Sequence, residues 1–198
     1  MTIFWDVDTQ VDFMLETGKL YVPGAEKIIG PLRKLTSWAG AHAVPIIASA
    51  CAHHPEDREI ETYGPHCMAG TAGQQKIPET LLARRLVIPN RRIDLPDFGP
   101  FEQIVVEKQA FDVFTNPNTE EAVKRFGSHP RIILYGVATD ICVAAAARAL
   151  LERGCRVELV TDAIAALDEP NAAKFVEWFQ KHNGNFTTVN NVISQGTA

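Results

Sequence analysis

The sequence has no apolar run as long as the roughly 18–20 residues that a membrane-spanning helix needs. It has no basic cluster either, and its net charge is −5, so nucleic acids and anionic membrane surfaces are not expected partners. The first apolar stretch is not followed by the glycine-rich turn that cradles a dinucleotide phosphate. These absences argue against a membrane protein, a nucleic-acid-binding protein and a dinucleotide-dependent oxidoreductase, and we expect no organic cofactor.

Cysteine is scarce, with four residues in a chain of 198, which is too few and too scattered for a disulfide framework. Residues 1–6 contain neither a basic region nor the apolar core of a signal peptide, so we expect a cytoplasmic protein with reduced thiols. Cys155 is expected to pack in the core, and Cys67 to pack there or to form a pocket wall. This leaves Cys51 as a candidate ligand and Cys142 as a candidate nucleophile.

Short apolar, β-branched runs alternate with helical patterns, which predicts an α/β fold. Because these strands are apolar on both faces, we expect a three-layer αβα, Rossmann-like arrangement with a doubly wound, mostly parallel sheet of about six strands. The length favours one domain spanning residues 1–198. Residues 52–100 are rich in Pro, Gly and His, and apart from an apolar run at 86–88 their path is not predicted. The strands are expected at residues 3–7, 43–50, 103–107, 131–136, 156–161 and 185–189, and the helices at 25–41, 119–126, 140–153 and 170–182.

The most informative stretch surrounds one thiol. An apolar run at residues 131–135 leads through Gly136 to Cys142, which begins a predicted Ala-rich helix. The N-terminus of a helix carries a partial positive charge and spare N–H donors. These features favour a thiolate, which is the nucleophilic form of cysteine, and they can stabilise an oxyanion. The pattern therefore predicts an enzyme with a cysteine nucleophile.

Other reactive side chains follow the ends of neighbouring strands. In an open parallel sheet, ligands bind beyond the carboxyl ends of the strands, and Asp8, Cys51, Lys108 and Cys142 each follow a different predicted strand. A thiol that attacks an amide needs a base, a cation and oxyanion donors. We assign the base to Asp8, the cation to Lys108 and the oxyanion donors to the backbone N–H groups of Ala138 and Cys142.

Four segments resemble motifs of the isochorismatase-like cysteine hydrolases, the superfamily that includes the nicotinamidases. They are residues 8–13, 65–73, 107–108 and 136–143. The resemblance spans nearly the whole chain and implies the isochorismatase-like fold, an Asp8–Lys108–Cys142 catalytic triad and a cis peptide between Val137 and Ala138. It also implies that the cysteine attacks a carboxamide, that ammonia leaves and that water hydrolyses the thioester. The isochorismate-cleaving branch generally lacks this cysteine, so amide or ureido substrates are favoured over isochorismate.

The same resemblance implies a metal site, because nicotinamidases hold a zinc-type metal with an Asp-x-His pair and a later His. The matching residues in this chain are Cys51, His53 and His66, so a cysteine replaces the aspartate. Cysteine with two histidines is still an acceptable zinc set. The neighbouring His54 leaves open which imidazole would bind, and the three residues could instead serve a metal-free pocket.

The expected activity is hydrolysis of the C–N bond of a small, nicotinamide-like carboxamide. Phe13, Tyr63 and Phe111 are candidates for lining a flat substrate pocket. Two alternatives stay open: a metal-free ureido or N-carbamoyl amidohydrolase of the same family, and a non-catalytic or redox-regulatory protein that keeps the scaffold and a reactive thiol. By resemblance, we expect a homodimer or homotetramer whose other partner is a small-molecule amide or ureido substrate.

Overall fold

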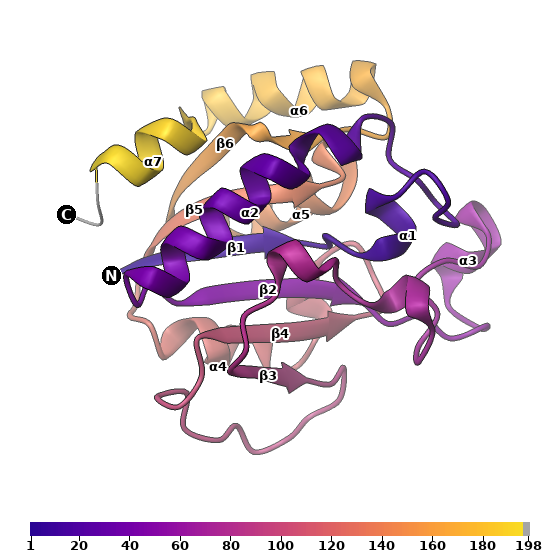
Figure 1. Cartoon of the computed structure of the whole chain (residues 1–198), viewed down its shortest axis with the longest axis horizontal. Helices are drawn as coiled ribbons and strands as arrows, with labels where there is room; N and C mark the ends of the chain where they lie inside the picture. Colours follow the sequence, from indigo (N-terminus) through magenta and orange to yellow (C-terminus); the bar gives the residue numbers. More distant parts are fainter. Residues whose placement is uncertain (196–198) are drawn as a thin grey trace.

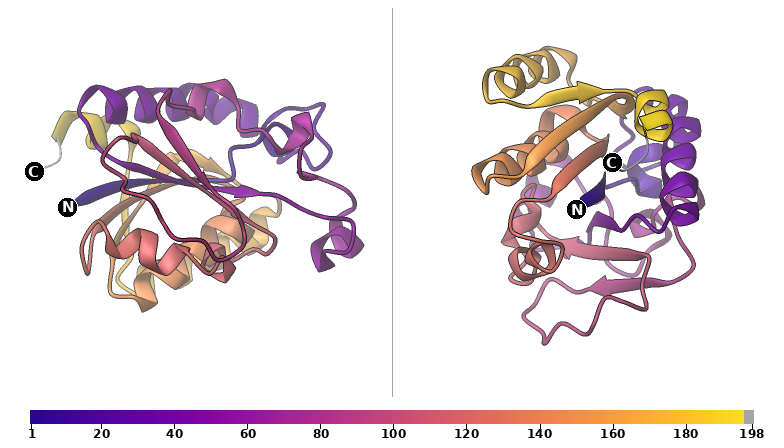
Figure 2. Two further views of the ribbon diagram at one scale, coloured as in Figure 1. Left: turned by 90° about the horizontal axis from the view of Figure 1, so that it is seen from below. Right: turned by 90° about the vertical axis from the view of Figure 1, so that its left-hand side faces the viewer.

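A seven-stranded, all-parallel sheet forms the centre of the molecule, with helices on both of its faces (Figures 1 and 2). The computed structural model describes residues 1–195. The strand order is β3-β4-β2-β1-β5-β6-β7. The strands are β1 (Thr2–Val7), β2 (Ile46–Cys51), β3 (Arg85–Ile88), β4 (Gln103–Lys108), β5 (Arg131–Val137), β6 (Arg156–Ala165) and β7 (Asn185–Thr187).

Two helical layers bury the two faces of this sheet. Helices α2 (Ala25–Ala41) and α7 (Val189–Gln195) cover one face, and α4 (Thr119–Lys124), α5 (Ala144–Glu152) and α6 (Glu169–Lys181) cover the other (Figure 2). Successive residues of β1 point to opposite faces, so that Phe4 joins one core while Ile3 and Trp5 join the other. The expected three-layer, doubly wound α/β architecture is therefore confirmed.

The observed elements differ from the sequence expectation in a few places. All six expected strands are present, and the short apolar run at 86–88 lies within a seventh, β3, at the edge of the sheet. The last expected strand ends two residues early, at Thr187, because Val189 begins α7 and buries its side chain against α2 and β6. The helix expected to start at Asp140 begins as a π-helical turn, η4 (Thr139–Val143), and only then continues as α5.

The segment between β2 and β4 folds into short pieces around one end of the sheet. It contains α3 (Arg58–Tyr63), the 3₁₀ turns η1 (Ala72–Gln74) and η2 (Pro78–Thr80), and β3. Together with α1 (Val11–Met14), α3 and η1 lie at the carboxyl ends of the strands (Figure 1). Among residues 1–195, no helix combines the length and apolar character needed to cross a bilayer.

The chain changes direction across the sheet at β1. The strands β2, β4 and β3 extend to one side of β1, and β5, β6 and β7 extend to the other. In such sheets the crevice at the switch between the two directions is the usual ligand site. Gly136 of β5 is required here, because an added Cβ would lie 2.1 Å from the carbonyl oxygen of Val7 and its φ is +118°. The close approach of β1 and β5 therefore brings the residues that follow both strands together.

Candidate active site

Asp8 is the first residue after β1, and its side chain is fully buried. Its backbone turns into the left-handed region, with a φ of 48°, so the chain leaves the strand sharply at this residue. One carboxylate oxygen accepts a hydrogen bond from Ser49 Oγ at 2.6 Å, and the other lies 2.9 Å from Lys108 Nζ. Burial acts to raise the pKa of Asp8, but Lys108 and Ser49 outweigh it and hold that pKa below its usual value.

Lys108 ends β4 and is only 1% exposed. Besides Asp8, its ammonium lies 3.1 Å from Cys51 Sγ, 3.4 Å from Cys142 Sγ and 3.1 Å from the carbonyl oxygen of Ala110. Burial alone would lower its pKa, but the negative charge of Asp8 and of the two cysteines raises it well above the usual value. Lys108 is therefore a permanent cation at the centre of the cluster.

Cys142 lies within η4, in the crossover between β5 and α5, and it is 7% exposed. The peptide bond between Val137 and Ala138 is cis, and both residues line the same pocket as Cys142. The sequence placed this cysteine at the first turn of an α-helix. The π turn instead precedes α5 and presents the sulfur toward Lys108, and such turns are frequent at functional sites.

The two thiols beside Lys108 titrate as a pair. Their mutual hydrogen bond lowers the pKa of Cys51 to about 5, while the same bond and burial raise the pKa of Cys142 well above its usual value. Loss of one proton from the pair is therefore favoured next to the ammonium, and loss of a second proton is disfavoured. The sequence suggests a lowered thiol pKa for Cys142, but in the structure the lowering belongs to the pair of thiols rather than to Cys142 alone.

Gln10 fixes the end of β2, a role that the sequence analysis did not assign. Its side-chain oxygen accepts from the backbone N–H of Cys51 at 2.7 Å, and its amide nitrogen donates to the carbonyl oxygen of the same residue at 2.8 Å. Ser49, which orients Asp8, was missed as well. The only sequence signal for either residue is its position within two residues of a residue already singled out.

A second polar cluster lies on the loop that follows β2 and on α3. Donor atoms of His53, Glu59 and His66 lie within 4.8 Å of one another. Asp57 lies 3.1 Å from His53 Nδ1, and the carbonyl oxygen of Gly64 lies 2.8 Å from His66 Nδ1. Because these oxygens accept, each Nδ1 is placed to donate, which turns each Nε2 toward the cluster, where His53 Nε2 lies 3.5 Å from Glu59 Oε2. Both imidazoles are therefore oriented as metal ligands.

The structure differs from the sequence expectation in one of the three candidate metal ligands. His53 is completely buried and His66 nearly so, whereas His54 is exposed, which resolves the choice within the His53–His54 doublet. Cys51 is not among the donors that lie within 4.8 Å of one another, and its sulfur contacts Lys108 Nζ at 3.1 Å. Glu59 takes the third position, and burial raises its pKa to about 7. Glu59 could not be singled out in the sequence, because it lies in a run of charged residues typical of an exposed helix.

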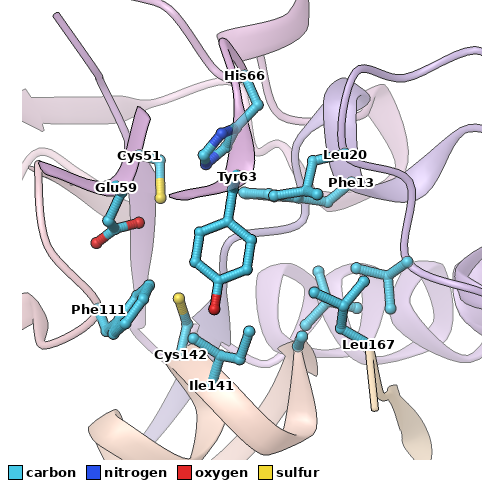
Figure 3. A pocket seen from close by; sticks show the side chains of 13 residues that line it. Phe13, Leu20, Cys51, Glu59, Tyr63, His66, Phe111, Ile141, Cys142 and Leu167 are labelled. Atoms are coloured by element: carbon cyan, nitrogen blue, oxygen red, sulfur yellow. The ribbon is translucent and has the colours of Figure 1, made fainter. Parts of the chain in front are cut away.

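One pocket connects the two clusters (Figure 3). The three aromatic residues singled out in the sequence, Phe13, Tyr63 and Phe111, all line it. So do Cys51 and Cys142, whose sulfurs point toward one another across the pocket, and Glu59 lies at its side (Figure 3). The remaining lining residues are Leu20, Val22, His66, Val137, Ala138, Ile141 and Leu167. Among the residues that the structure describes, neither Lys nor Arg lines this pocket, so it suits an uncharged, flat apolar group.

The remaining two cysteines lie away from the pocket lining. Cys67 packs in the core beneath α2, and its backbone N–H donates to Asp12 Oδ2 at 2.7 Å. Cys155 packs in the opposite core at the start of β6. The core-packing expectation for these two thiols agrees with these positions.

Comparison with known proteins gives consistent results. The family model of the isochorismatase domain matches residues 3–191, whereas no curated protein sequence matches the chain. Among solved structures, N-carbamoylsarcosine amidase from Thermoplasma acidophilum is 26% identical, with a TM-score of 0.76 over 96% of this chain and 98% of that one. Pyrazinamidase of Pyrococcus horikoshii, solved in complex with zinc, is 23% identical, with a TM-score of 0.76 over 94% and 98% of the two chains.

An isochorismatase-like hydrolase from Alkaliphilus metalliredigens is 22% identical and superposes with a TM-score of 0.79 over 98% of both chains. It shares the same fold, a parallel sheet between two helical layers. The family match covers nearly the whole chain, including every strand of the sheet. The chain therefore belongs to the isochorismatase family of hydrolases.

Proposed function

We propose that this protein is an amidase that uses Cys142 to cleave the C–N bond of a small, uncharged carboxamide and releases ammonia. The observation that carries the proposal is the meeting of three side chains at one end of the pocket. Lys108 Nζ lies 2.9 Å from Asp8 Oδ2 and 3.4 Å from Cys142 Sγ. An ammonium that contacts both a carboxylate and a thiol brings together the base, the counter-charge and the nucleophile for acyl transfer.

In the first half of the reaction, Cys142 attacks the carboxamide carbon. Its proton passes to Asp8, and Lys108 stabilises the negative charge that remains on the sulfur. The negative charge that develops on the substrate oxygen is met by the backbone N–H groups of Ala138 and Cys142, since both residues line the pocket at this point. Buried donors are effective here because water does not compete with them.

In the second half, Asp8 returns its proton to the amine, which leaves as ammonia, and a thioester with Cys142 is formed. Water then attacks the thioester, and Asp8 acts again as the base. This use of one carboxylate as acid and base fits its position, because Asp8 is held by Ser49 and Lys108 beside the two pocket thiols, with Cys51 Sγ 3.8 Å from Asp8 Oδ2.

The pocket favours a neutral aromatic amide over a substrate with a carboxylate. Its wall is formed mainly by aromatic and aliphatic side chains, and Glu59 is the charged side chain that lines it. Among the side chains that line the pocket, a substrate carboxylate would find no Lys or Arg partner and would lie beside Glu59, and burying an unpaired charge is costly. A nicotinamide-like carboxamide is therefore the proposed substrate class.

We also propose that His53, Glu59 and His66 hold a zinc ion. Two imidazole nitrogens and one carboxylate oxygen are a common zinc set that leaves a fourth position open. Within residues 1–195, His53 Nε2 and Glu59 Oε1 are buried without a hydrogen-bond partner, as expected for atoms that coordinate a metal ion. When bound, zinc would supply a Lewis-acidic contact for a substrate lone pair, while Asp57 keeps the imidazole of His53 oriented.

A second candidate is a metal-free ureido or N-carbamoyl amidohydrolase. It is favoured by the 26% identity to the N-carbamoylsarcosine amidase over 96% of this chain. The triad would act in the same way, and only the leaving group and the shape of the substrate would differ. The absence of a cation in the pocket wall, among the described residues, counts against substrates of this class that carry a carboxylate.

The test is ammonia release from nicotinamide, pyrazinamide and N-carbamoylsarcosine, each with and without a chelator. We expect turnover of the two aromatic amides, a loss with chelator, and a loss on the order of 10⁴-fold in Cys142→Ala. Cys155→Ala is the matched control, because that thiol is buried far from the pocket, and it should retain turnover. Near-full turnover by Cys142→Ala would overturn the mechanism, and chelator-insensitive turnover of N-carbamoylsarcosine alone would select the second candidate.

A further inference from the structure

Two cysteine sulfurs share one ammonium at the base of the pocket. Cys51 Sγ lies 3.1 Å and Cys142 Sγ 3.4 Å from Lys108 Nζ, so the two sulfurs contact the same ammonium. They come from distant parts of the chain, since one ends β2 and the other lies in η4. Both sulfurs point into the pocket and toward one another (Figure 3).

The surroundings of the pair separate it from the other two thiols. All four thiols are buried, but Cys51 and Cys142 both line the pocket, whereas Cys67 and Cys155 do not. Amidase chemistry needs one of the two pocket thiols and leaves the other, Cys51, without a role. The zinc donor cluster does not include Cys51 either.

We propose that Cys51 is a resolving thiol that captures Cys142 after oxidation by a peroxide and forms a reversible Cys51–Cys142 disulfide. The proposal rests on the position of the two sulfurs and goes beyond amide hydrolysis. It would hold for this pair whether or not the protein is an amidase.

The chemistry balances in two steps. The Cys142 sulfur attacks one peroxide oxygen, so that an S–O bond forms and the O–O bond breaks. Cys142 becomes a sulfenic acid, and the other oxygen leaves as water with the thiol proton. The Cys51 sulfur then attacks the sulfenic sulfur, an S–S bond forms, the S–O bond breaks, and a second water leaves with the Cys51 proton. Two thiols are thus oxidised by two electrons in total, and one hydrogen peroxide is reduced to two waters.

The pair would give the enzyme a protected state. Without a resolving thiol, a sulfenic acid can take up more oxygen and become a sulfinic acid, which is not reversed by ordinary thiols. A disulfide stops oxidation at a stage that a dithiol can reverse. Lys108 is suited to both steps, because it faces both sulfurs and can stabilise negative charge on either one.

The experiment uses the full-length protein treated with a few equivalents of hydrogen peroxide, alkylated and analysed by intact-mass and peptide mass spectrometry without reduction. In the wild type, we expect two of the four thiols to be lost, a linked peptide that joins Cys51 to Cys142, and full recovery of both thiols with dithiothreitol. In Cys51→Ser, we expect no linked peptide and an irreversible gain of two oxygens on Cys142. Cys155→Ser is the matched control and should behave like the wild type.

Three outcomes would overturn the proposal. The first is over-oxidation of Cys142 in the wild type at the same rate as in Cys51→Ser. The second is a disulfide that joins Cys51 to Cys67 rather than to Cys142. The third is retention of all four thiols at peroxide concentrations that oxidise a free cysteine. None of these readouts depends on turnover of an amide, so a failure here is distinct from a failure of the proposed amidase function.

Discussion

Replacing Lys108 with Met tests the electrostatic core of the site. The methionine keeps a long apolar stem of similar length but removes the ammonium that Asp8, Cys51 and Cys142 share. Asp8 is completely buried, so the variant leaves a carboxylate without a counter-charge in the protein interior. The Ser49 hydroxyl at 2.6 Å is then its remaining strong partner.

The expected loss is large relative to the stability of an ordinary protein. Removing one partner of a buried ion pair costs about 3–5 kcal/mol, because the other charge stays buried and unpaired. The free energy of unfolding of a single-domain protein is typically about 5–15 kcal/mol. The double variant Asp8→Asn with Lys108→Met removes both charges, so it should be more stable than Lys108→Met alone. A double-mutant cycle isolates this coupling.

The pH dependence of the stability has a defined sign. In the wild type, the folded-state pKa of Asp8 is lowered, so its stabilising contribution is present above the unfolded value of 3.8 and is lost as the pH falls through the lower folded value. In Lys108→Met, burial dominates and the folded pKa of Asp8 rises above 3.8. The variant should therefore regain stability relative to the wild type as the pH is lowered from 7 toward 5.

Urea unfolding at both pH values, followed by the fluorescence of the buried Trp5, measures these differences. A native-like Lys108→Met within about 1 kcal/mol of the wild type at pH 7 would refute the assignment of Lys108 as the essential counter-charge. A deficit that does not shrink on acidification would show that lost packing, rather than the unpaired carboxylate, causes the effect.

Three further predictions follow from the site. Gly136→Ala would place a Cβ 2.1 Å from the Val7 carbonyl oxygen, so we expect a loss of about 1–3 kcal/mol in urea unfolding and a lower kcat; unchanged values would contradict the close packing of β1 and β5. His53→Ala and Glu59→Ala should each reduce the zinc content measured by mass spectrometry by about 10-fold or more at limiting zinc, and full retention would exclude this ligand set. The free energy of unfolding of Cys142→Ala in urea should lie within about 1 kcal/mol of the wild-type value, and a large loss would indicate a structural thiol.

The sequence was sufficient for the architecture because its signal is repeated along the chain. The central strands are short, buried runs, and helical patterns alternate with them along most of the chain, so the parallel, doubly wound sheet follows from the pattern. Two elements, the edge strand β3 and the last helix α7, were not predicted. The edge strand β3 has an exposed face and only four residues, and α7 starts where β-propensity and helix propensity compete.

The residues that carry the proposed chemistry were accessible from the sequence for a related reason. Asp8 follows β1, Lys108 ends β4 and Cys142 lies in the turn after β5, and the carboxyl ends of parallel strands meet at one edge of the sheet. Topology therefore brings these residues together without any knowledge of side-chain packing. The partners Ser49 and Gln10 could not be found in this way, because they act through side-chain hydrogen bonds that depend on exact rotamers.

The exchange of Cys51 for Glu59 in the candidate metal cluster shows the limit of motif reasoning most clearly. The motif predicts which residue lies at the end of β2, and Cys51 does lie there. Its sulfur, however, contacts two charged side chains, Lys108 and Asp8. Lys108 offers a full positive charge at 3.1 Å, and the position beside His53 Nε2 is occupied by another donor at 3.5 Å. Glu59 reaches that position from α3, within a segment whose path the sequence could not define. The replacement of one ligand thus frees a second thiol beside the nucleophile, and this change gives the proposed redox chemistry its physical basis.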